Sequence, residues 1–112
     1  MKMSKERMAE IDKMDMSDKR AIFIFAHTVL QVEAKIMAQA GIDPDGNVGS
    51  IDQSLEHMAG AACDIAYMRH LFTDDSTIEA DIQAETNPWL VAFDDEYQRA
   101  QFRAREETNA GK

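Results

Sequence analysis

The chain has 112 residues, of which 45% are hydrophobic and 29% charged, and its net charge at pH 7 is −9. This balance is typical of a folded globular protein and not of a disordered chain, while the acidity argues against direct binding to nucleic acid. A single cysteine excludes an intrachain disulfide framework, and the length fits one domain over 1–112. The longest apolar run, 21–26, is far too short to span a membrane. We therefore expect a cytoplasmic protein without membrane contact.

Residue types that favour the start of a helix occur at five places along the chain. Ser4 is the predicted N-cap of the first helix, and Ser17 begins the second. Ser50 and Ser76 each start a capping box, and Pro88 occupies the first position of the last helix. The turn-forming residues 43–49 separate the second helix from the third. The predicted helices cover about 5–14, 18–40, 51–72, 77–85 and 88–108.

These elements predict an all-α fold, a small helical bundle of four to five helices in a single domain. Residues 1–16 form either the short first helix or an N-terminal arm that docks on a partner. The arm is an alternative because this segment holds five of the eight methionines, whose flexible side chains suit adaptable contacts. Residues 109–112 are predicted to be a frayed tail.

The second predicted helix is apolar on more than one side. Ile22, Phe25 and Val29 follow the 3.6-residue period, and two further apolar residues fall off that face. Such a helix either lies centrally between neighbours or meets a second copy of the chain. The last predicted helix also has apolar residues opposite its main face. The residues predicted to support self-association are Phe23, Ile24, Val91 and Phe102.

Two features of the predicted core are unusual. Glu33 lies near the middle of the apolar face of the second helix, so a buried carboxylate there would need a partner or a raised pKa. A tilted helix would instead leave Glu33 at the margin of that face. Residues 59–63, Ala-Gly-Ala-Ala-Cys, are small and predict a close approach by another helix.

The most informative feature for function is an acidic run. Between His70 and Gln98 the chain carries eight carboxylates and no lysine or arginine. A surface of one sign attracts a basic partner at long range and repels nucleic acid, although some of these acids also suit helix N-termini. The predicted partner-binding surface consists of Asp74, Asp75, Glu79, Asp81, Glu85, Asp94, Asp95 and Glu96, with Trp89 as an apolar anchor.

The chain carries no catalytic or cofactor signature. His27, His57 and His70 lack the spacing of a helical metal pair, and Cys63 lies mid-helix among alanines, where a thiol is inert. The segment 43–54 begins like a calcium loop but lacks its glycine and its final glutamate. We therefore predict no enzyme activity, no cofactor and no metal site.

Three hypotheses for function remain. The first is a non-enzymatic acidic module that occupies a basic, nucleic-acid-binding surface of a host protein. Some anti-restriction and anti-CRISPR proteins of phages and mobile elements work in this way, and the chain is similar to them in size, acidity and helix content, without a motif that identifies a family. The alternative is a helical structural or assembly protein that forms a homodimer or larger homo-oligomer. The third is a small helical enzyme or metal-binding bundle.

Overall fold

The computed structural model describes residues 3–40 and 48–110, and over this part of the chain it contains helices and no strand. Its elements are α1 (Lys5–Asp12), α2 (Met16–Ala40), α3 (Val48–Met68), the 3-10 helix η1 (Arg69–Leu71) and α4 (Ile78–Ala110). The predicted all-α bundle is confirmed. Most of the predicted turn at 43–49 lies outside the described residues.

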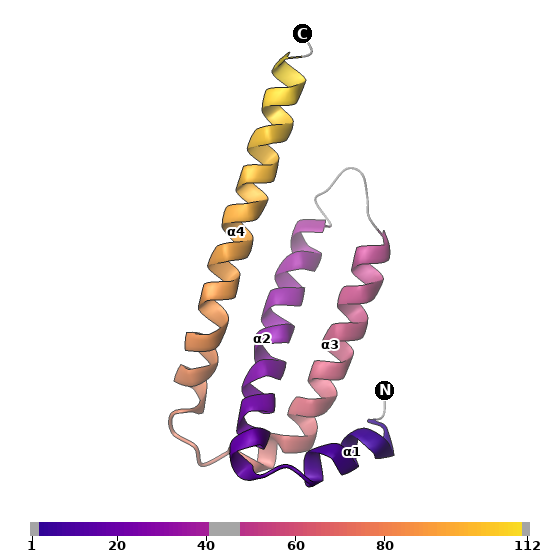
Figure 1. Cartoon of the computed structure of the whole chain (residues 1–112), viewed down its shortest axis with the longest axis vertical. Coiled ribbons are helices and arrows are strands. Elements are labelled where there is room, and N and C mark those ends of the chain that lie inside the picture. Colours follow the sequence, from indigo (N-terminus) through magenta and orange to yellow (C-terminus); the bar gives the residue numbers. More distant parts are fainter. Residues whose placement is uncertain (1–2, 41–47, 111–112) are drawn as a thin grey trace.

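The three long helices lie side by side with α2 in the middle (Figure 1). α3 runs antiparallel to α2 on one side, α4 runs parallel to it on the other, and α1 crosses the end at which α2 begins and α3 ends. α2 packs against both outer helices, which explains why it is apolar on more than one side. The molecule measures 60 × 28 × 17 Å, so it is long and thin.

Local hydrogen bonds determine where the first two helices begin. The backbone N–H of Arg7 donates to Ser4 Oγ at 3.1 Å, which confirms Ser4 as the N-cap of α1. α2 begins at Met16, earlier than predicted, because the carboxylate of Asp15 accepts the N–H of Asp18 at 2.8 Å and acts as the cap. α3 begins at Val48 and not at the predicted Ser50 cap. It ends at Met68, and η1 continues the chain to Leu71.

The predicted break before Pro88 is wrong, because α4 is one continuous helix of 33 residues with Pro88 inside it. Proline removes the N–H that would bond the carbonyl of Ala84, which costs about 3 kcal/mol inside a helix. Ala84 and Pro88 are both exposed, so water can bond that carbonyl. Thr86 before the proline is buried and Leu90 after it is half-buried. Packing on both sides of Pro88 therefore holds the helix together. Residues 109 and 110, predicted to be frayed, continue this helix, and 111–112 lie outside the described residues.

The core lies at the end of the molecule where all four α-helices meet. The rings of Phe23 and Phe72 are 4.8 Å apart, and Met68 has no exposed surface. The buried apolar side chains of the described residues are Ile11, Phe23, Ala26, Ala61, Ile65, Met68, Phe72, Ile78 and Ile82, and Ile24 is partly buried against them. Phe23 is therefore covered within the chain and Ile24 partly so, whereas Val91 and Phe102, the other residues predicted to support self-association, are exposed. A helix with two neighbours also buries residues outside its strongest apolar stripe.

α2 is also long and apolar enough, by length and composition, to cross a membrane. Its segment Met16–Ala38 has the length and the mean hydropathy (1.4) of such a span, by composition alone. However, Arg20, Glu33 and Lys35 of this segment all bond to side chains of α3, of α4 or of the turn before α4. These polar bonds connect α2 to its neighbours within the bundle.

Candidate functional site

Arg20 of α2 binds two carboxylates of the acidic run. Its Nε donates to Asp75 Oδ2 at 2.8 Å, and its Nη2 donates to Asp81 Oδ2 and to Thr77 Oγ1. Asp75 also accepts the backbone N–H and the hydroxyl of Thr77. The guanidinium of Arg20, followed by these Thr77 bonds, lowers the pKa of Asp75 to about 2. These two carboxylates therefore connect α2 to the start of α4.

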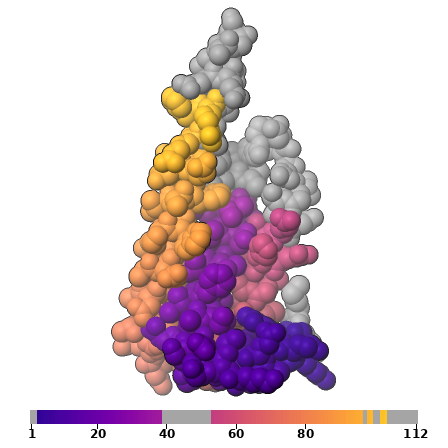
Figure 2. Space-filling view, in the orientation of Figure 1, coloured from indigo at the N-terminus to yellow at the C-terminus, as the bar shows by residue number. Residues whose placement is uncertain are grey.

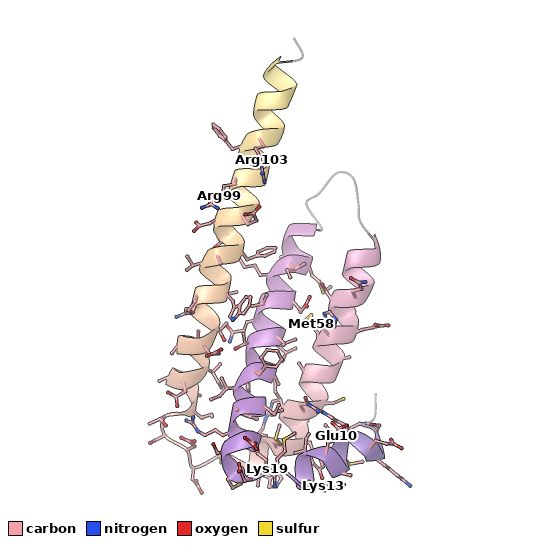
Figure 3. All side chains as sticks on the ribbon, viewed as in Figure 1. Glu10, Lys13, Lys19, Met58, Arg99 and Arg103 are labelled. Carbon is pink, nitrogen blue, oxygen red and sulfur yellow. The ribbon has the colours of Figure 1, made fainter. Side chains whose placement is uncertain are left out.

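Two further members of the acidic run also have cationic partners. Lys35 Nζ of α2 forms an ion pair with Asp94 Oδ2 of α4. Glu96 lies 3.4 Å from Arg103 and 3.9 Å from Arg99, and Figure 3 shows these two arginines on the part of α4 that projects beyond α2. The sequence suggested that the run is not neutralised, but the tertiary structure brings cations to half of it.

The other four carboxylates, Asp74, Glu79, Glu85 and Asp95, have exposed side chains. Among the described residues none of them forms an ion pair. At 100° per residue, Glu85 and Asp95 lie about 80° apart around α4, whereas Glu79 is well over 100° from either. Val91 and Phe102, which are 60% and 62% exposed, lie within about 40° of Asp95 around the helix, on the side away from Glu85. We call Glu85, Val91, Asp95 and Phe102 the outer side of α4.

Protonation of Asp75 in acid weakens its bonds to Arg20 and Thr77, so we expect the protein to lose stability at low pH. The folded pKa of about 2 lies below the ordinary value of 3.8, so the stabilisation is complete above about pH 4 and disappears as the pH falls towards 2. We expect Asp75→Asn to narrow the difference between urea midpoints measured at pH 6 and at pH 2.5. Asp74→Asn is the matched control and should leave that difference as in the wild type. An Asp75→Asn protein as acid-sensitive as the wild type would contradict the assignment.

A second surface is the part of α2 that neither α3 nor α4 covers. We define the α2 face by the residues that share this side of the helix: Ile22, Phe25, Val29, Val32 and Ile36. Phe25 is 59% exposed and the other four are half-buried. In Figure 2 the surface of α2 remains visible between α3 and α4, with α1 across its lower end.

Grooves flank the α2 face on both sides. A groove of about 480 Å³ lies between α2 and α3, and its lining includes Phe25, Val29 and Ala61. A smaller groove of about 170 Å³ lies between α2 and α4, where Trp89 faces Phe25 and Val29. Trp89 is 58% exposed, as an anchor requires, and it lines this apolar groove.

Paired charges border the larger groove. Arg7 of α1 donates to both carboxylate oxygens of Asp64 at 2.8 and 3.1 Å, and this bond raises the pKa of Arg7. His57 Nδ1 lies 2.7 Å from Glu33 Oε1, and the Glu33 side chain is only 16% exposed. Glu33 is thus half-buried and has a partner, as a carboxylate on the apolar face of this helix would need. Residue spacing alone could not have identified His57 as that partner.

The predictions for the N-terminal arm and for the small residues of α3 agree with the structure only in part. Residues 5–12 form a helix, and Ile11 of this helix is buried in the core, so this part of 1–16 is not a free arm. The small residues at 59–63 form a close contact only in part, because Ala61 is buried but a side chain at Gly60 would meet open space. Within the described residues no three His, Cys, Asp or Glu side chains gather as a metal site would require.

The candidate functional surfaces are therefore the outer side of α4 and the α2 face. The chain matches no protein-family model, no curated protein and no solved structure.

Proposed function

We propose that this chain is a non-enzymatic protein-binding module whose outer side of α4 occupies a basic, nucleic-acid-binding surface of another protein in the cytoplasm. One observation carries the proposal: Asp95 is exposed beside the exposed apolar side chains of Val91 and Phe102, and Glu85 is exposed on the same helix. Carboxylates supply attraction at long range, and apolar side chains supply contact area once the partner is in place. Such a module would suit an inhibitor that a phage or another mobile element produces against a host protein.

The charge balance supports the same proposal. The acidic run contains eight carboxylates, and four cations pair with members of it, Arg20 and Lys35 of α2 and Arg99 and Arg103 of α4, which leaves a charge of −4 for this group. The two cations of α2 point inward, into bonds with Asp75, Asp81 and Asp94. A basic protein that approaches α4 would therefore meet a net negative charge, although Arg99 and Arg103 are also exposed there, and this net charge raises its association rate at low salt.

The test compares two double variants with the same change in net charge. Glu85→Lys with Asp95→Lys reverses the outer side of α4, whereas Glu6→Lys with Glu56→Lys reverses exposed acids on α1 and α3. Each immobilised protein is exposed to a host lysate at low salt, and bound proteins are eluted with duplex DNA. We expect the wild type and the α1/α3 variant to retain the same DNA-eluted protein.

The kinetics of that captured protein complete the test. Its association rate with the outer-side variant should fall by about tenfold or more and should lose its salt dependence, because steering by charge is removed. Equal association rates for both double variants, or a captured protein that saturating DNA does not displace, would contradict the proposal.

The homo-oligomeric alternative is favoured by a different observation, the exposed α2 face. It is compatible with an acidic binding module, because a dimer formed through that face would present two acidic outer sides.

A further inference from the structure

The molecule exposes more surface than a chain of its size should. Its accessible surface is 7965 Å², which exceeds the roughly 6,200 Å² expected for a compact monomer of this length by about 1,800 Å². Its radius of gyration is 17.8 Å, against about 13 Å for a compact domain. The projecting end of α4 accounts for part of this excess, and the uncovered α2 face contributes to the rest.

The excess is larger than the area that one partner buries in a typical stable dimer. A specific interface of standard size buries about 800 Å² on each partner. The three long helices form a single layer. The apolar side chains on the open face of this layer can therefore be covered only if a second layer packs on it. A second copy of the chain would supply that layer and would turn two thin layers into one two-layer bundle.

The shape of the α2 face is suited to its own copy. A two-fold interface requires that one patch contain both the projection and the hollow that receives it. Here Phe25 and Val29 form a ridge, and the grooves against α3 and α4 lie directly beside that ridge. After a two-fold rotation the ridge of each copy can enter a groove of the other, as ridges pack into grooves between helices.

The charges near this face do not oppose such a contact. Arg7 and Asp64 neutralise each other within the chain, and the carboxylate of Glu33 is bonded to His57. The exposed acids Glu85 and Asp95 lie on α4, outside both grooves. The patch is therefore mainly apolar, and Glu33 is its one carboxylate without a permanent cation beside it, although the whole chain is strongly acidic.

From these observations we propose that the α2 face is a homodimer interface, in which Phe25 of each copy packs into a groove beside α2 of the other. Trp89 lines the smaller groove and would be covered in the dimer. This inference goes beyond the proposed function and does not depend on it, because it uses a different surface of the molecule.

The test uses two phenylalanines that are equally exposed on different surfaces. Phe25 is 59% exposed on the α2 face, and Phe102 is 62% exposed on the outer side of α4. Analytical ultracentrifugation over a range of concentrations should give the wild type twice the chain mass at micromolar concentration. Phe25→Ser should raise the dimer dissociation constant by about a hundredfold or more, since each dimer contains the side chain twice. Phe102→Ser should behave as the wild type.

Two further measurements separate this proposal from its alternatives. Far-UV circular dichroism should show equal helix content in all three proteins, since both substituted side chains are exposed. High salt should leave the dimer intact, whereas it should weaken binding of a basic partner, so the two proposals can fail separately.

Three outcomes would overturn the inference. One is a wild type that stays monomeric at every concentration. Another is a dimer that Phe102→Ser disrupts and Phe25→Ser does not, which would place the interface on the outer side of α4. The last is wild type that floats with phosphatidylcholine vesicles while Phe25→Ser does not, which would make lipid the occupant of the α2 face.

Discussion

Phe23→Ala is expected to lower the free energy of unfolding by about 3–5 kcal/mol, because it removes a large buried ring and leaves a cavity. Phe23 is 5% exposed, and its ring packs against Phe72 and lies edge-on to His27 with the centroids 4.8 Å apart in both pairs. The cavity would open between α2, the turn before α4 and η1. Urea unfolding followed by circular dichroism measures the change.

Phe102→Ala is the matched control for this substitution. The Phe102 side chain is 62% exposed, so its loss should change the free energy of unfolding by less than about 0.5 kcal/mol. All the proteins must be compared at one concentration, since dimerisation would add to the apparent stability. Similar small losses from both substitutions would show that Phe23 does not belong to the core.

The next largest effect is expected at a buried pair of hydroxyls between α2 and α4. Thr28 Oγ1 and Thr86 Oγ1 lie 2.8 Å apart, and Thr28 Oγ1 also donates to the carbonyl of Ile24 at 3.2 Å. Thr86 therefore donates to Thr28. Thr86 has no exposed surface, and in the described part of the chain its hydroxyl has Thr28 as its hydrogen-bond partner. Thr28→Val should cost about 1–3 kcal/mol, because it leaves the Thr86 hydroxyl buried and unbonded.

A double-mutant cycle tests this pair. Thr28→Val with Thr86→Val keeps the shape of both side chains and removes both hydroxyls, so most of the stability lost in Thr28→Val should return. Urea unfolding of the wild type, the two single variants and the double variant gives the coupling energy. Strictly additive losses would mean that the two hydroxyls do not interact.

Short-range features of the fold were predictable from the sequence. Ser4 caps α1 because its side chain needs only the N–H of a residue three positions later. The long helices follow from the apolar period and from the abundance of helix-forming residues. The exposure of Val91 and Phe102 also agrees with their expected place opposite the main apolar face of the last helix.

Errors arose where distant residues compete with a local preference. Pro88 favours a helix start, but the packing of Thr86 and Leu90 on either side of it keeps α4 continuous. Periodicity separated Phe23 from the main apolar stripe of α2, but a second neighbouring helix buries it. Neither effect can be derived from a window of neighbouring residues, because each depends on which helix lies opposite.

The sequence by itself determined the helical class of this protein, its acidity and the position of its acidic run. The tertiary structure decided which of those carboxylates remain available, since Arg20 reaches Asp75 and Asp81 across 55 and 61 residues and Lys35 reaches Asp94. It also decided that the α2 face is open, with Phe25 beside two grooves. The physical reason is the same in both cases. Caps and helical periods act over a few residues, whereas ion pairs and exposed faces depend on how whole helices pack.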